Sequence, residues 1–233
     1  MPDVFAANRA YLRGWDPTHP PDGDLVIYRS GVAHPPLNGV VRSRGVPVEE
    51  AIAEARRRLA GVPWTWWVGP DSSAGLADEL LARGATEVFR LPVMTIDLDR
   101  VDFAVPDGVR IGPADDVTEF VTAYSKVSHI HDVPRAVERE STLDVLRFEA
   151  RVDGFLAATA VGWLSHGVTT VYLVGTHPDY RRRGIGTAVT AAALVAGRER
   201  GLRLGALTAS AMGEAVYRRM GFTTVAHYRL LAV

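Results

Sequence analysis

The spacing of hydrophobic residues along the chain changes repeatedly between the period of a helix and the period of a strand. This pattern predicts helices alternating with short strands. Pro47–Ala60 and Ser73–Arg83 are predicted helices, because the first has acidic residues in its first turn and arginines near its end, and Gly84 stops the second. The aromatic run Trp64–Val68 is a predicted strand, and the loosely alternating run Val88–Leu98 is predicted to be one extended strand or two. The tryptophans of residues 64–67 are expected in the core.

Residues 1–45 contain many prolines, glycines and short polar stretches. Within them, Leu25–Tyr28 is the one segment that resembles a strand. Residues 99–108, with a proline and several aspartates, are predicted to be a linker. The chain is therefore divided into an N-terminal αβ region over residues 1–105 and a second region over residues 106–233.

A second series of elements follows residue 108. Asp153–Gly154 is a strong signal for a two-residue hairpin turn, and Ser128–Arg139 is predicted to be loop with a short helix. The alternation favours an α/β chain with a sheet of mixed direction. The remaining strands are expected over Val109–Ile111, Val145–Val152, Phe155–Ser165, Thr169–Thr176, Arg203–Ala209 and Thr223–Leu231, and the helices over Ala114–Val127, Ile185–Arg200 and Gly213–Met220.

Composition narrows the function class. The 233 residues include no cysteine, which excludes disulfides, thiolate–metal sites and an enzyme-bound thioester. A formal net charge of −1 argues against non-specific nucleic-acid binding. The first residues lack an apolar signal-peptide segment, and no apolar run approaches the ~20 residues of a membrane span. We expect a cytoplasmic protein with no nucleic-acid or membrane partner; a homodimer is compatible with these features.

The most informative stretch is residues 171–194, VYLVGTHPDYRRRGIGTAVTAAAL. A predicted strand ends here at Thr176, and an arginine-rich loop turns through Gly184 and Gly186 into a helix. Glycines let a ligand approach the main chain, and consecutive N–H groups at a helix N-terminus form an anion site. The loop therefore suits a pyrophosphate. It lacks the G-K-[ST] of ATP-binding loops and the spacing of the dinucleotide fingerprint.

This stretch resembles the acetyl-CoA signature of the GNAT-type N-acetyltransferase superfamily, Q/R-x-x-G-x-G/A, which Arg181, Gly184 and Gly186 satisfy. A second motif of the family lies downstream, where Tyr217 precedes Gly221–Phe222 in SAMGEAVYRRMGF. The resemblance covers about residues 109–233 and implies a GNAT-like acyl-CoA-binding domain. The N-terminal region resembles the family only faintly, as a degenerate half-copy would.

The resemblance implies acetyl-CoA as co-substrate, with no metal. The pantetheine arm would lie against the backbone of the predicted strand, and the arginine–glycine loop would wrap the pyrophosphate. Ser210 stands where family members often have an asparagine that contacts the cofactor. The implied cofactor-binding residues are Val174, Gly175, Thr176, Arg181, Arg182, Arg183, Gly184, Ile185, Gly186, Thr187 and Ser210.

Without cysteine, the simplest reaction is direct attack of a bound primary amine on the acetyl carbonyl in a ternary complex. The resemblance assigns Tyr217 as the acid that protonates the departing thiolate, since a phenol with a pKa near ~10 keeps its proton at neutral pH. Many family members carry a basic glutamate where this chain has Thr169–Thr170–Val171. Other candidates for the base are His129, His131, Asp132, His166 or a chain of water molecules.

The acceptor is expected to be a small molecule or a peptide with a primary amine, bound by the loops Ser128–Arg139 and Leu164–Thr169. His129 and His131 share one side of an extended segment, but two histidines without further ligands do not make a metal site. Two other functions stay open. The chain could bind acyl-CoA as a non-catalytic sensor, or its loop could bind another nucleotide.

Overall fold

The structure is a computed structural model that describes residues 1–102 and 104–233. Its helices are α1 (Val4–Gly14), α2 (Val48–Arg58), α3 (Leu76–Ala82), α4 (Val117–Ser128), α5 (Val133–Ser141), α6 (Ile185–Glu199) and α7 (Ala211–Arg219). Its strands are β1 (Leu25–Arg29), β2 (Asn38–Ser43), β3 (Thr65–Val68), β4 (Thr86–Asp97), β5 (Val109–Pro113), β6 (Leu146–Val152), β7 (Phe155–Ser165), β8 (Val168–Thr176), β9 (Leu204–Thr208) and β10 (Thr223–Ala232).

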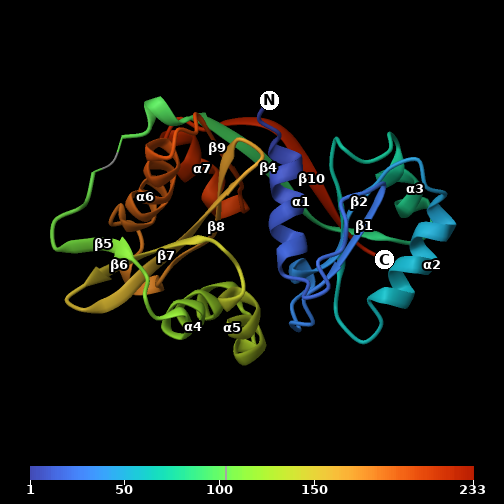
Figure 1. Cartoon of the computed structure of the whole chain (residues 1–233), viewed down its shortest axis with the longest axis horizontal. Helices are drawn as coiled ribbons and strands as arrows, with labels where there is room; N and C mark the ends of the chain where they lie inside the picture. The colour runs from blue at the N-terminus through green and yellow to red at the C-terminus, as the bar shows by residue number, and fades with distance from the viewer. Residues whose placement is uncertain (103) are drawn as a thin grey trace.

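All of these strands belong to one sheet, in the order β1-β2-β3-β10-β4-β9-β8-β7-β6-β5. The pairs β2–β3 and β8–β9 are parallel and the others are antiparallel, so the prediction of a mixed α/β sheet is confirmed. The last strand, β10, lies between β3 and β4 rather than at an edge. Figure 1 shows β4 and β10 running side by side across the molecule, between the α2–α3 side and the α6 side.

Helices cover both faces of the sheet. One face of β6 to β9 packs on α6, whose small side chains allow a close approach: a Cβ on Gly197 would lie 1.8 Å from Thr169 Oγ1. The opposite face carries α1, α4 and α5 around an aromatic core that includes Tyr11, Phe120 and Tyr228. Trp66 packs with α2 and α3, and Trp67 lies in the aromatic core. The expectation that the tryptophan cluster packs in the core is thus correct for these two residues.

One prediction of local structure was wrong. Residues 1–45 hold a full helix, α1, and a second strand, β2, beside the predicted β1. In α1 the buried face includes Asn8 and Arg9, which hides its amphipathic pattern. The loop with a short helix predicted over residues 128–139 is confirmed: residues 129–132 form the loop, and α5 follows with Pro134 in its first turn. Of the two alternatives for residues 88–98, one extended strand is correct, and it is β4.

The predicted hairpin through Asp153–Gly154 is present between β6 and β7, with both residues at positive φ. The proposed linker corresponds to the segment between β4 and β5, of which Phe103 lies outside the described residues. The sheet is continuous across this segment, because β10 pairs with both β3 and β4. The division of the chain at residue 105 stays a prediction.

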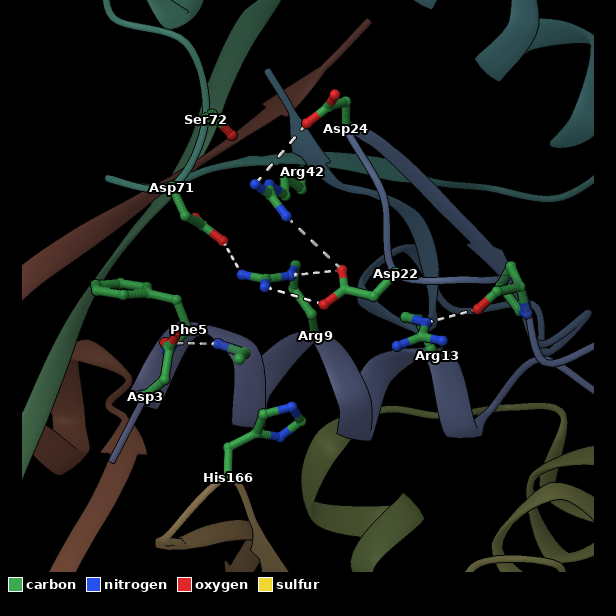
Figure 2. Close-up of polar contacts among 12 residues, drawn as sticks. Asp3, Phe5, Arg9, Arg13, Asp22, Asp24, Arg42, Asp71, Ser72 and His166 are labelled. Atoms are coloured by element: carbon green, nitrogen blue, oxygen red, sulfur yellow. Dashed lines mark hydrogen bonds and ion pairs between the residues drawn. The ribbon is translucent and has the colours of Figure 1, made fainter. Parts of the chain in front are cut away.

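Helix α1 contacts both parts of the chain. Toward β7 and β8, the N–H of Asp3 donates to the carbonyl of His166 at 3.1 Å. Toward the N-terminal region, Arg9 donates to both carboxylate oxygens of Asp22, at 3.0 and 3.1 Å, and also to Asp71. Figure 2 shows Arg9 reaching from the helix between these two aspartates. Burial opposes ionisation of Asp22, but the hydrogen bond and charge of Arg9 outweigh it and lower its pKa.

Replacing Arg9 with methionine should destabilise the protein by about 3–5 kcal/mol, because it removes a buried guanidinium that pairs with both Asp22 and Asp71. Urea unfolding would measure the change. Arg57→Met is the matched control, since Arg57 forms an exposed pair with Glu54 and its loss should cost about 1 kcal/mol or less. Equal effects of the two substitutions would contradict a structural role for the Arg9 cluster.

Candidate functional site

The two central parallel strands separate at one end of the sheet. β8 pairs with β9 only over Val168–Thr170, opposite Leu204–Ala206. β8 then continues to Thr176 and β9 to Thr208 without further pairing between them. The backbone groups of β8 that face β9 beyond Thr170 therefore have no strand partner on that side. Such groups favour a ligand that can hydrogen-bond to them.

A β-bulge in β8 adjusts the direction of this free strand. Thr159 of β7 lies opposite Gly175 and Val161 opposite Tyr172, so β8 has one extra residue in the interval. Leu173, within the bulge, has a φ of +49°, which is unusual for a non-glycine residue. The hydroxyl of Thr159 donates to the Leu173 carbonyl at 2.9 Å and holds the bulge.

The loop after β8 ends in an anion-binding arrangement. Arg182 has a φ of +64° and Gly184, the N-cap of α6, has a φ of +73°. Such left-handed residues turn successive N–H groups toward one point, and the first N–H groups of α6 have no partner within the helix. A Cβ on Gly186 would lie 2.9 Å from Thr176 Oγ1, so the glycine keeps the helix start close to the end of β8.

The end of β8, this loop, the start of α6 and α7 line a cavity of about 550 Å³, a size typical of ligand sites. All the cofactor-binding residues predicted from the sequence line it except Arg183, and so does Tyr217. The guanidinium of Arg183 instead lies over the Tyr180 ring, 5.4 Å from its centre. Arg181 turns back, and its Nε donates to the Thr176 carbonyl at 3.2 Å.

Several cavity residues were missed by sequence reasoning. Val127 comes from α4 and Tyr180 from the loop, while Met212, Gly213, Val216 and Arg219 come from α7. The α7 residues could have been found, because their spacing of three and four residues places them on the helix face that carries Tyr217. Val127 could not, since only the fold brings α4 to the end of β8.

Tyr217 lies in α7 with its ring 5.7 Å from that of Phe222, in an edge-to-face arrangement. Burial raises the pKa of Tyr217 to about 12, although a hydrogen bond with Thr190 acts in the opposite direction. At neutral pH the phenol therefore holds its proton and is able to donate it. Tyr217 is also one of the residues that line the cavity.

Ser210 has a defined structural role. It is the N-cap of α7, and its hydroxyl accepts a hydrogen bond from the Gly213 N–H at 3.2 Å. Because a serine hydroxyl can still donate while it accepts, Ser210 keeps a donor for a ligand in the same cavity. Its assignment as a cofactor contact stays a prediction.

The residues considered as the general base lie in different parts of the fold. His166 lies in the turn before β8, and the length of the strand separates it from Thr176 by roughly 26 Å at ~3.3 Å per residue. His129 ends α4 at a φ of +56°, and it and His131 are exposed on either side of the buried Ile130. Thr169 faces Gly197 of α6, and the buried hydroxyl of Thr170 has no hydrogen-bond partner.

In the described part of the chain, no group of three or more His, Asp or Glu side chains is arranged to hold a metal ion. Over the same residues, none of the helices combines the length and the apolar character that crossing a membrane requires.

Comparison with known proteins gives one family match and many similar folds. Residues 142–224, which contain the separated strands, the loop and α7, match the family described as acetyltransferase (GNAT) domain. The resemblance deduced from the two sequence motifs is therefore confirmed for this part of the chain. No curated protein matches the sequence.

Among solved structures, a GCN5-related N-acetyltransferase from Kribbella flavida is 24% identical, with a TM-score of 0.73 over 99% of this chain and 95% of its own. A putative GNAT acetyltransferase from Novosphingobium aromaticivorans is 18% identical, with a TM-score of 0.61 over 99% of both chains. A tandem GNAT protein of the clavulanic acid biosynthesis pathway is 18% identical, with a TM-score of 0.62 over 89% of this chain and 77% of its own. At these identities the likeness concerns the fold, which is GNAT-like along the whole chain.

Proposed function

With residues 142–224 forming an acetyltransferase (GNAT) domain, we propose that the protein transfers an acetyl group from acetyl-CoA to a primary amine in a ternary complex. The observation that carries the proposal is the cavity at the end of β8, which combines an unpaired stretch of strand with an anion-binding helix start. These two features match the two chemical parts of CoA, an amide-bearing arm and a pyrophosphate.

The pantetheine arm would bind along Val174–Thr176, where its amide groups would complete the hydrogen bonds that β9 does not make. The pyrophosphate would lie at the start of α6, against the N–H groups from Arg182 to Thr187. The chain's cationic side chains Arg181 and Arg182 add favourable charge on the cavity wall.

The same arrangement supports the acyl transfer. A backbone N–H of Val174–Thr176 would stabilise the negative charge that develops on the thioester oxygen. The amine nitrogen forms a bond to the carbonyl carbon as the carbon–sulfur bond breaks. Tyr217 supplies a proton to the CoA thiolate. The nitrogen releases one proton to solvent and Tyr217 takes one up, so that a neutral amine and acetyl-CoA give an amide and CoA. At neutral pH Tyr217 carries the proton that this role requires, because burial raises its pKa to about 12.

Calorimetric titration of the protein with acetyl-CoA, CoA, ATP and NAD tests the first part of the proposal. We expect micromolar binding of acetyl-CoA and CoA only. Stronger binding of ATP or NAD would overturn it and favour a different nucleotide ligand. Tight CoA binding without release of free thiol in the presence of any amine would favour a non-catalytic acyl-CoA sensor.

A further inference from the structure

A second cavity adjoins the cavity at the end of β8. Its volume is about 410 Å³, and Thr187, Val216 and Arg219 line both cavities. Thr187 belongs to the first turn of α6, the part of the helix expected to bind the pyrophosphate of CoA. In the CoA molecule, the group that follows the pyrophosphate is an adenosine with a phosphate on its 3′ oxygen. The second cavity is therefore placed to receive the adenosine end of the cofactor.

The wall of this second cavity combines apolar surface with two arginines. Its apolar part comes from α6, from α7 and from the segment after β4, and small or aliphatic side chains leave room there for a flat ring. The arginines are Arg100, which follows β4, and Arg219 of α7. A purine ring and a phosphate group need these two kinds of surface. The apolar residues are Val101, Ala188, Ala191, Val216 and Met220.

Both arginines keep their hydrogen-bond donors available. They are exposed, and within the described residues neither Arg100 nor Arg219 makes a hydrogen bond or an ion pair. The residue next to Arg219 differs in this respect, because Arg218 pairs with Glu214 at 2.6 Å. A guanidinium group with free donors can bind two oxygens of one phosphate group at the same time. The two arginines therefore favour a phosphate ligand in this cavity.

The backbone on both sides of Arg100 is held against α6. Arg100 ends a short 3-10 helix, η2 (Leu98–Arg100), which packs on α6. Arg198 of α6 donates hydrogen bonds to the carbonyls of Leu98 and Val101, at 3.1 and 3.2 Å. The side chains of Leu98 and Val101 are both buried. Because the backbone is already ordered, a ligand that binds Arg100 has to order the side chain only, which lowers the entropic cost of binding.

We propose that the second cavity binds the adenosine 3′-phosphate part of CoA, and that Arg100 and Arg219 bind the 3′-phosphate. The protein then discriminates between CoA and dephospho-CoA, which differ by this phosphate alone. The inference rests on the proposed acetyl transfer, to which it adds two residues that determine cofactor specificity. Because Arg100 precedes residue 105, the predicted N-terminal region takes part in cofactor binding.

The charges at the second cavity fit a phosphate monoester. Such a group carries nearly two negative charges at pH 7, and Arg100 and Arg219 supply two positive charges. Asp102 is the one acidic residue among the described residues that line the cavity, and it is exposed to solvent. Because all of these charged groups are exposed, salt should screen the attraction between the arginines and the phosphate.

Calorimetric titration of the protein with CoA and with dephospho-CoA tests the inference. The wild type should bind CoA about tenfold more tightly than dephospho-CoA, and this preference should decrease at high salt concentration. Arg100→Met and Arg219→Met should each reduce the preference, and the double substitution should abolish it. Both side chains are exposed, so the substitutions should leave the fold intact.

Arg203→Met and Arg218→Met are the matched controls, because each removes an exposed arginine that is already paired with a carboxylate and lines neither cavity. Both variants should keep the preference for CoA. Equal binding of CoA and dephospho-CoA by the wild type, or an unchanged preference in Arg100→Met, overturns the inference. An equal loss of affinity for both ligands in Arg219→Met overturns the assignment of Arg219 to the 3′-phosphate. Failure of the wild type to bind either ligand instead overturns the proposed function.

Discussion

Gly186→Glu should leave no measurable affinity for acetyl-CoA. The new Cβ would lie 2.9 Å from Thr176 Oγ1, and the carboxylate would extend into the cavity at the N-terminus of α6. It would occupy the place of the pyrophosphate and repel its negative charge. We expect a loss of at least about 100-fold, or ~2.7 kcal/mol, in calorimetric titration.

Two other glycine substitutions separate the effect of added bulk from the effect of added charge. Gly186→Ala adds only the methyl group, which a rotation of the Thr176 hydroxyl can accommodate, and should weaken binding much less. Gly23→Glu adds the same charge where nothing lies within 4 Å of a new Cβ, and should leave affinity unchanged. Normal acetyl-CoA binding by a folded Gly186→Glu protein would mean that the pyrophosphate binds elsewhere.

Tyr217→Phe should lower kcat by about 100-fold or more while the dissociation constant of acetyl-CoA changes little. The substitution removes the proton donor for the thiolate but keeps the ring that packs on Phe222. Steady-state kinetics by thiol release, with calorimetry on the same samples, would measure both quantities.

Tyr180→Phe makes the same chemical change in the same cavity. The Tyr180 ring stacks on Phe155 at 5.2 Å, and its hydroxyl has no part in the proposed reaction, so kcat should be unaffected. Equal kcat in Tyr217→Phe and the wild type would remove Tyr217 from the mechanism. Equal losses in both variants would indicate a general disturbance of the cavity.

The cofactor loop was predictable because its signals are local. Gly184 and Gly186 mark a turn into a helix, and nearby residues of one strand and one helix build the anion site. The positive φ of Leu173 was not predictable, since a leucine gives no sign of a left-handed conformation and the bulge depends on pairing with β7. The direction of Arg183, over the Tyr180 ring, also depends on tertiary contacts.

Glu140 illustrates the limit for buried polar residues. It stands in VPRAVERES, where charged residues are typical of a solvent-exposed helix. It is nevertheless fully buried and paired with Arg147 of β6, a contact that follows from no local pattern. Helix α1 was not predicted for the same reason, because Asn8 and Arg9 are polar residues on its buried face. The burial of a charged side chain by segments distant in the sequence cannot be predicted from its sequence neighbours.

The place of β10 has a consequence for how the protein reaches its native state. This strand connects β3 with β4 although more than 120 residues separate it from either. The two parts of the sheet can join only after residues 223–232 have been synthesised, so β10, the last described strand along the chain, completes the sheet. Contacts of such long range favour slow folding, and until β10 inserts, the facing edges of β3 and β4 are open to aggregation.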